Sequence, residues 1–251
     1  MTVLRHLLPL ALLAAAATTR VVAADVDDAN ANLWMSYIGD HPVSGPWGVH
    51  LETQVRRSDF GGDWQQVLVR PGVNYTLNSK VSFSGGYCFV ETFPYGDYPA
   101  KDSFPEQRVW EQVVVKVPAL GLTWVNRLRL EQRYIGVPEP TPDGGYQTGY
   151  YRYENRIRYM LRTAVPLGKE SKYQFIVWDE VFFNFGSQVS GNEFDQNRIF
   201  VGIGRDLGKG FRIEAGFLEQ TLQRRGGQIR ENNHTLALYL ISNAPFGGQG
   251  K

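Results

Sequence analysis

Apolar and polar side chains alternate with a period of two along nearly the whole chain after Asp25. Several of the alternating segments are 13 to 17 residues long, whereas a strand of a soluble protein usually has about five or six residues. Segments with helical apolar spacing and helix caps are absent from the sequence. The pattern therefore predicts an all-β protein with about eleven strands, at residues 32–39, 46–57, 63–77, 80–93, 105–117, 121–135, 149–165, 172–185, 194–207, 210–223 and 233–242.

The predicted strands have one charged face and one apolar face with aromatic residues near its ends. Side chains alternate between the two faces of a strand, so each face can be followed at every second residue. In the segment 121–135, the charged face holds Arg127, Arg129, Glu131 and Arg133, and the apolar face holds Leu122, Trp124, Leu128, Leu130 and Tyr134. Aromatic residues at the ends of apolar faces are typical of the girdles at the two membrane interfaces.

The connections between predicted strands are short at one end and long at the other. The short connections are 78–79, 119–121, 168–171 and 208–210, and the long ones are 94–104, 136–148 and 186–193. This asymmetry is typical of bacterial outer-membrane barrels, which have short periplasmic turns and long extracellular loops. Closure also removes the edge strands that such a repeat would otherwise expose. We therefore predict a closed antiparallel transmembrane β-barrel of about 10–12 strands.

The exact number of strands depends on the first segment. Single-chain bacterial barrels have an even number of strands, and the pattern yields eleven. We expect ten strands if the segment at Leu33 does not span, or twelve if one strand is missing from the count.

The N-terminus has the features of a secretory signal peptide. Arg5 and His6 form a basic start, residues 7–17 are apolar, and Ala23 and Ala24 complete a cleavage site of small residues. The alternative, a transmembrane helix, needs about 20 apolar residues, which this run does not reach. We predict that residues 1–24 are removed and that residues 25–251 form a single outer-membrane β-barrel domain in a Gram-negative bacterium.

Composition excludes several classes of protein. The formal net charge of +1 gives no general case for nucleic-acid binding. One cysteine excludes a disulfide framework and a zinc site built from several cysteines. A mean hydropathy of −0.30 excludes a helical membrane protein. The 13% aromatic residues and 27 glycines fit interfacial girdles and turns.

The strand-like segments resemble an uncharacterised family of bacterial outer-membrane β-barrels known as domain of unknown function 2490. The resemblance covers roughly residues 33–240, and its most specific segment is Asn126-Arg127-Leu128-Arg129-Leu130-Glu131-Gln132-Arg133. It also includes Val69-Arg70-Pro71-Gly72, Glu106 to Gln112, Tyr151-Arg152-Tyr153, Asp179-Glu180 and Phe194 to Arg198. The resemblance implies an outer-membrane barrel and no activity. One departure is the C-terminus, which continues to Lys251 instead of ending on an aromatic strand residue.

If the apolar faces meet lipid, the charged faces line the lumen. The candidate lumen or anion-binding residues are Arg56, Arg70, Arg108, Arg127, Arg129, Glu131, Arg133, Arg152, Glu154, Arg156, Arg158, Glu180, Arg198 and Glu214. Glu52, Glu106, Arg162, Asn184 and Arg212 share these faces, which makes 12 Arg and six Glu. The excess of arginine favours a lumen that binds or passes small anions. The alternative is a structural plug of Arg–Glu pairs, with Glu111, Asp179 or loop carboxylates reducing the excess.

Other functions are less well supported by the residues. A surface-binding or adhesion protein would use the loops 94–104 and 136–148, and a lipid-modifying enzyme would use His50 or His234. No serine-containing motif accompanies either histidine, so we expect no enzyme, and no catalytic residue is assigned. No cofactor and no metal site are expected. The expected partners are outer-membrane lipid, lipopolysaccharide, the barrel-assembly machinery and small anionic solutes, and not nucleic acid. A soluble periplasmic β-sandwich is a further alternative.

Overall fold

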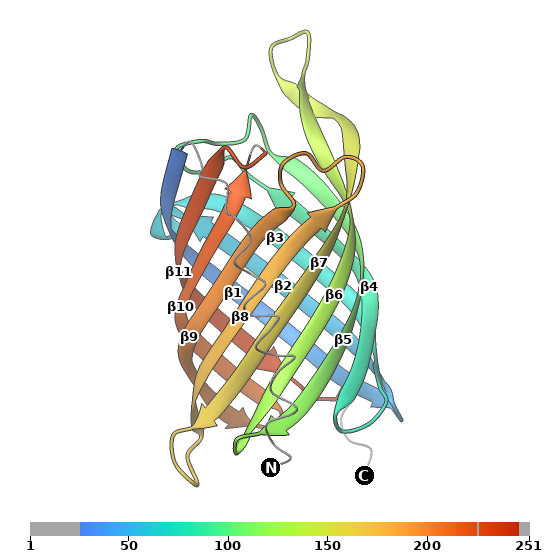
Figure 1. Cartoon of the computed structure of the whole chain (residues 1–251), viewed down its shortest axis with the longest axis vertical. Coiled ribbons are helices and arrows are strands. Elements are labelled where there is room, and N and C mark those ends of the chain that lie inside the picture. The colour runs from blue at the N-terminus through green and yellow to red at the C-terminus, as the bar shows by residue number, and fades with distance from the viewer. Residues whose placement is uncertain (1–25, 225, 246–251) are drawn as a thin grey trace, which may run out of the picture.

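The computed structural model describes residues 26–224 and 226–245, which form a closed barrel of eleven strands (Figure 1). The predicted signal peptide at residues 1–24 lies outside this part of the chain. The strands are β1 (Val26–Ser44), β2 (Trp47–Ser58), β3 (Asp63–Thr76), β4 (Val81–Thr92), β5 (Phe104–Ala119), β6 (Leu122–Pro140), β7 (Tyr146–Pro166), β8 (Tyr173–Phe185), β9 (Phe194–Gly208), β10 (Phe211–Arg224) and β11 (Ile229–Ser242). The prediction of an all-β closed barrel is confirmed. Each of the eleven alternating segments overlaps one strand, and the soluble β-sandwich is excluded by the single closed sheet.

The barrel closes through a parallel pair, while every pair of sequence neighbours is antiparallel. β1 pairs with β11 in parallel from Val26↔Ile229 to Gly39↔Ser242. An odd number of strands that alternate in direction leaves the first and last strand running the same way, so the closing pair must be parallel. The expected even count of strands is therefore wrong for the described residues. The segment at Leu33 belongs to a full strand, and Asn32 on it bonds Asn233 across the closing pair at 2.8 Å.

The two ends of the barrel differ as the sequence predicts. At the end that we call the turn end, the strands are joined by the short connections 45–46, 77–80, 120–121, 167–172 and 209–210. At the opposite end, the loop end, β4 joins β5 through residues 93–103 and β8 joins β9 through 186–193. The predicted loop 136–148 is mostly strand instead, because β6 and β7 continue as a hairpin that rises above the barrel and turns at 141–145 (Figure 1). β1 begins at the loop end, and β11 finishes at the turn end.

The distribution of polarity is the reverse of that in a soluble domain. Among the described residues, 31 polar or charged residues are buried, against 14 hydrophobic ones. The outward faces carry exposed apolar side chains such as Val109, Leu128 and Val201. Glycines on two neighbouring strands leave room for an inward aromatic ring. Gly202 on β9 pairs with Gly216 on β10, and a Cβ at Gly202 would lie 2.5 Å from the Phe200 ring. Within the described ranges, no helix is long and apolar enough to cross a membrane.

Candidate functional site

The barrel interior contains two cavities that lie toward its two ends. The loop-end vestibule has a volume of about 300 Å³ and includes Thr92, Tyr95 and Arg224 in its wall. The turn-end vestibule has a volume of about 680 Å³ and includes Lys116, Gln174 and Asn243. Five residues line both cavities, namely Trp34, Glu52, Gln54, Arg158 and Arg198. These shared residues mark the level at which the two vestibules meet.

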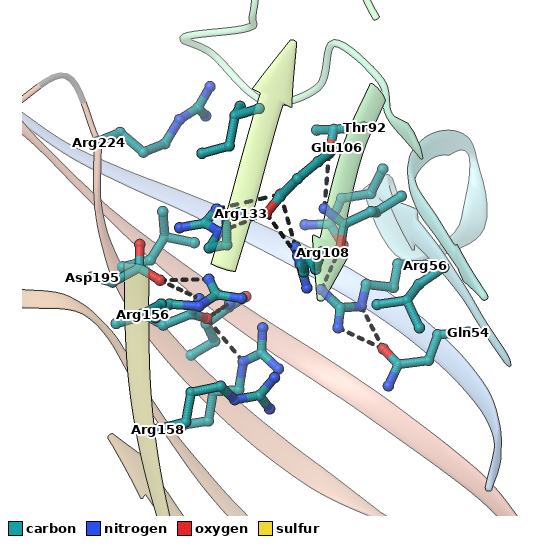
Figure 2. A pocket seen from close by; sticks show the side chains of 18 of the residues that line it. Gln54, Arg56, Thr92, Glu106, Arg108, Arg133, Arg156, Arg158, Asp195 and Arg224 are labelled. Carbon is teal, nitrogen blue, oxygen red and sulfur yellow. Dashed lines mark hydrogen bonds and ion pairs between the residues drawn. The ribbon is translucent and has the colours of Figure 1, made fainter. Parts of the chain in front are cut away.

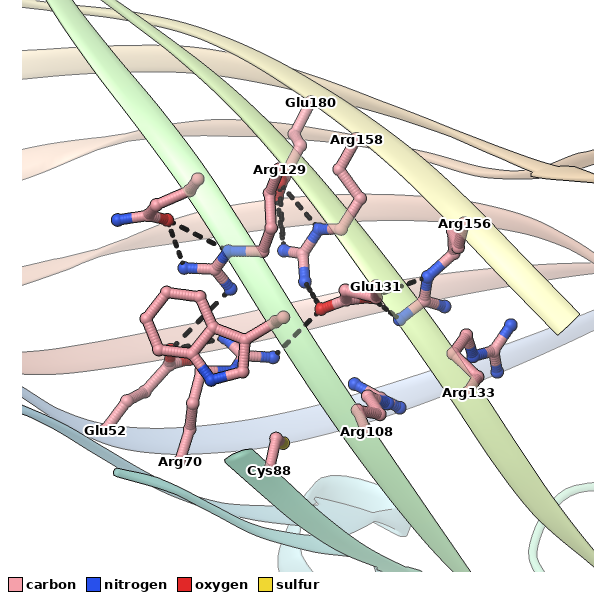
Figure 3. Close-up of polar contacts among 12 residues, drawn as sticks. Glu52, Arg70, Cys88, Arg108, Arg129, Glu131, Arg133, Arg156, Arg158 and Glu180 are labelled. Carbon is pink, nitrogen blue, oxygen red and sulfur yellow. Dashed lines mark hydrogen bonds and ion pairs between the residues drawn. The ribbon is translucent and has the colours of Figure 1, made fainter. Parts of the chain in front are cut away.

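A chain of ion pairs crosses the barrel at this level (Figure 3). Glu52 on β2 accepts from Arg70 on β3 at 2.5 Å, and Arg70 reaches Glu131 on β6 at 3.3 Å. Arg158 on β7 then bridges Glu131 at 2.8 Å and Glu180 on β8 at 2.9 Å. We call these five residues the central layer. Glu131 has no exposed surface and Arg70 only 2%, so these two members of the central layer are enclosed by the surrounding protein.

Glu131 is the centre of this layer. Its carboxylate accepts hydrogen bonds from Arg70, Arg156 and Arg158, and the shortest, from Arg156, is 2.5 Å long. Arg129 lies beside it, with its guanidinium 4.9 Å from the centre of the Trp110 ring and bonded to Gln112. A buried carboxylate among several guanidiniums offsets their mutual repulsion, so its loss would leave uncompensated buried charge.

Further carboxylates hold the arginines of the loop-end vestibule (Figure 2). Arg108 and Arg133 stand opposite each other on β5 and β6, which by itself would be unfavourable. Glu106 bonds both of them, at 2.7 Å to Nε of Arg108 and at 2.5 Å to Nε of Arg133. Arg156 forms a second ion pair with Asp195 at 2.8 Å. These contacts fix the guanidiniums around the cavity.

All fourteen predicted lumen residues lie on the inner wall, where the structure brings them together. Twelve of them are buried, Arg127 is partly exposed, and Glu180 pairs with it at 2.8 Å. Arg152 is the most exposed, at the loop-end mouth, where it pairs with Glu154 at 2.7 Å. Glu214 accepts from Arg162 and Arg212 near the turn end. Their placement follows from the strand alternation, whereas a role in anion binding stays a prediction.

Two of the twelve arginines assigned to the lumen from the sequence form no ion pair among the described residues. Arg56 bonds the side-chain oxygens of Gln54 and Gln66, and Nε of Arg198 bonds Gln196 at 2.9 Å. Both guanidiniums pack on the Trp34 ring, at 4.0 Å and 5.1 Å from its centre. Their exposed fractions are 8% and 9%. The other ten arginines each have a carboxylate within 4.0 Å.

The carboxylates suggested from the sequence as additional partners are not the ones that the fold uses. Glu111 and Asp179 point outward, where they accept from Gln132 and Asn197 on neighbouring strands. Asp195 points inward instead, because a register irregularity between β8 and β9 places two successive residues, Asp195 and Gln196, on the inner wall. Strict alternation assigns Asp195 to the outside, and the signal for the irregularity is absent from the sequence pattern.

A loop residue also enters the site. Tyr95, in the connection between β4 and β5, lines the loop-end vestibule and donates to Glu231 on β11 at 2.5 Å. Burial and the adjacent Glu231 carboxylate raise the pKa of the Tyr95 hydroxyl, which therefore stays protonated as a donor. Glu231 also pairs with Arg224 at 2.6 Å. The loop thus crosses part of the mouth, a contact that alternation along strands does not predict.

The two histidines considered for catalysis have carboxylate partners. Nδ1 of His50 lies 2.7 Å from Asp40, and its Nε2 lies 3.7 Å from Glu52. His234 points outward, with Nδ1 2.7 Å from Glu219. Among the described residues, no serine hydroxyl forms a hydrogen bond with either imidazole ring. In the same part of the chain, no three metal-binding side chains gather at one point.

Comparisons with known proteins agree with the family suggested by the sequence. The chain is 28% identical over 195 residues to an uncharacterised protein of Methylorubrum extorquens, covering 76% of this chain and 78% of that protein. Among solved structures, it is similar to the β-domain of the Bordetella autotransporter BrkA, with 10% identity, a TM-score of 0.42, and coverage of 70% of this chain and 78% of that one. The family model described as a protein of unknown function, DUF2490, matches residues 31–232. The chain therefore belongs to the DUF2490 family.

Proposed function

We propose that this protein is an outer-membrane β-barrel that binds a small anion in its loop-end vestibule. The observation that carries the proposal is the pair Arg56 and Arg198, which are buried against Trp34 without a carboxylate partner. A buried guanidinium is costly unless a negative charge is close to it. An anion that enters the vestibule supplies this charge, and two guanidiniums bind phosphate, sulfate or carboxylate through several hydrogen bonds.

The charge of the surrounding wall supports the same ligand class. Nine arginines and four carboxylates line the loop-end vestibule. Glu131 and Glu231, which contact these arginines, raise the number of carboxylates to six and leave a positive excess. Positive charge on a low-dielectric wall concentrates small anions. We infer binding rather than free conduction, because the central layer lies between this vestibule and the turn end.

The outer surface supports a membrane location. Apolar side chains on the outward faces suit lipid, and a closed barrel satisfies its backbone hydrogen bonds internally. Aromatic residues gather at both borders, for example Trp47 and Tyr75 at the turn end and Tyr134 and Tyr153 toward the loop end. Our proposal places the turn end in the periplasm and the loop end outside, with lipid, lipopolysaccharide and the barrel-assembly machinery as partners.

Anion binding is tested with the mature protein purified in a non-ionic detergent. Inorganic phosphate and sulfate are titrated calorimetrically at low and high salt. We expect saturable binding that weakens at high salt and falls at least tenfold in Arg56→Gln and in Arg198→Gln. Arg230→Gln, which removes a cation from the outer surface of β11, is the matched control and keeps the wild-type affinity. Equal affinities in all four proteins, or no saturable binding, would contradict the proposal.

The membrane location is tested separately. Cell fractionation and unboiled gels should place the protein in the outer membrane as a species whose migration changes on heating. Recovery in the soluble periplasmic fraction without detergent would refute the location.

The protruding hairpin supports a second candidate function, binding at the cell surface. Residues 136–149 of β6 and β7 extend beyond the barrel wall (Figure 1), and Tyr146 and Tyr150 on the hairpin are exposed. Exposed tyrosines are frequent anchors in protein interfaces. Deletion of residues 138–147 should abolish partner capture while the barrel still assembles, whereas unchanged capture would exclude the hairpin.

We propose no catalytic activity for this barrel. This proposal is supported by the other ring nitrogen of each histidine: Nδ1 of His50 and of His234 meets a carboxylate, as in a catalytic triad, but no serine hydroxyl among the described residues bonds Nε2. Purified protein that leaves phospholipid and lipopolysaccharide unchanged would agree with it, and turnover lost in His50→Ala or His234→Ala would refute it.

A further inference from the structure

We propose that the turn-end vestibule binds an amphipathic anion, with the apolar body of the ligand toward the central layer and its anionic group near the mouth. This site goes beyond the small-anion site at the loop end and uses a different wall of the barrel. The cavity of about 680 Å³ falls within the range of about 300–1,000 Å³ that is usual for small-molecule pockets.

One side of this vestibule is apolar, in contrast to the arginines and carboxylates elsewhere on its wall. Met160 and Ala164 on β7, Trp178 on β8, Leu218 on β10 and Tyr239 on β11 line it. Trp178 stacks on Phe200 with ring centres 5.4 Å apart, and Tyr239 meets the same Phe200 ring edge-on at 5.5 Å. These rings support one another, so they form a firm apolar wall against which an alkyl or aryl group can pack.

Cationic side chains lie nearer the mouth than Met160 and Leu218 of this wall. Arg162 on β7 and Arg212 on β10 both contact Glu214, at 2.6 Å and 2.7 Å. Two guanidiniums therefore share one carboxylate, and the pair retains a net positive charge. Their exposed side-chain fractions of 18% and 30% show that they are accessible from the cavity.

The positions along the strands set the orientation of the ligand. Arg162 is two residues nearer the turn end than Met160 on β7, and Arg212 is six residues nearer than Leu218 on β10. Lys116 on β5 also lines this vestibule and forms no ion pair within the described ranges. Arg162 and Arg212 thus form an outer zone, and Met160 and Leu218 form an inner apolar zone, while Ala164 lies two residues nearer the turn end than Arg162. A carboxylate, sulfate or phosphate monoester attached to an apolar body matches both zones, whereas inorganic phosphate matches only one.

The test uses the mature full-length protein held in an amphipathic polymer, with octanoate, acetate and 1-octanol as probes. We expect saturable binding of octanoate that is at least tenfold tighter than that of acetate or 1-octanol. Arg212→Gln should weaken octanoate binding at least fivefold, and Ala164→Phe should weaken it by narrowing the cavity beside Arg162. Lys169→Gln, at an exposed turn of the same end outside the cavity, is the matched control and retains wild-type affinity.

A brominated probe reports the position of the apolar body. Bromine quenches indole fluorescence on contact, so 8-bromooctanoate should produce saturable quenching that is lost in Trp178→Phe. If quenching never saturates, or if it persists in Trp178→Phe, the probe is dissolved in the polymer near the outer tryptophans. Either result overturns the proposal. Equal binding of octanoate and 1-octanol also overturns it. If phosphate binding at Arg56 fails while octanoate binding persists, the loop-end proposal falls and this one stands.

Discussion

Glu131 is the position at which a single isosteric change should affect the stability of the barrel most clearly. Glu131→Gln keeps the shape of the side chain and removes its negative charge. The carboxylate has no exposed surface and accepts from Arg70, Arg156 and Arg158. In the variant, one positive charge of this group loses its compensation inside the barrel, and the new amide N–H group faces guanidinium donors.

The magnitude follows from the number and kind of contacts. Breaking a buried ion pair by removing one partner costs about 3–5 kcal/mol, because the remaining charge stays buried. Arg70 retains Glu52 and Arg158 retains Glu180, so part of the compensation survives. We therefore expect a loss of about 3 kcal/mol in the free energy of unfolding, near the lower end of that range.

The assay is urea unfolding of the protein refolded into lipid vesicles, followed by tryptophan fluorescence. Glu139→Gln, on the exposed hairpin, is the matched control and should change the free energy by less than about 0.5 kcal/mol. The double variant Glu131→Gln with Arg158→Gln restores local neutrality and should lose less stability than the two single variants together. If Glu131→Gln is as stable as Glu139→Gln, or if the two losses simply add, the central layer does not stabilise the barrel as we argue.

Three further predictions follow from the fold. Because β1 begins at the loop end, the cysteine in Asp27→Cys should react with a membrane-impermeant maleimide on intact cells. The cysteine in Asn243→Cys, at the turn end, should react only after the outer membrane is opened. Labelling of both variants on intact cells would contradict the parallel closing pair. Gly202→Ala should lower the free energy of unfolding by about 1–3 kcal/mol in urea titration. Gly144→Ala should cost only about 1 kcal/mol, because its Cβ has no atom within 4 Å and only its φ of +87° is unfavourable. Equal losses would argue against the close contact of a Cβ at Gly202 with Phe200. Tyr95→Phe removes the bond to Glu231 and should speed tryptic cleavage of the connection between β4 and β5, and an unchanged cleavage rate would show that this bond does not hold the loop.

Alternation along the strands determined the barrel and the orientation of its charged faces. Because a strand turns every second side chain to the same side, residues such as Arg129 and Glu131 could be assigned to the lumen from their sequence spacing. Local spacing also indicated the lengths of the turns. These properties depend on neighbours in sequence and need no knowledge of which strands meet across the barrel.

The partnerships inside the lumen were decided only by the tertiary structure. Arg70 meets Glu131 across 61 positions of sequence, and Trp34 contacts both Arg56 and Arg198 because β1, β2 and β9 face the same lumen. The parallel closing pair depends on the number of strands being odd, whereas the rule that such barrels have an even number of strands predicted ten or twelve. The irregularity that turns Asp195 inward depends on register between β8 and β9. Spacing along one strand determines which face a side chain occupies, whereas closure and register determine which charge it meets there.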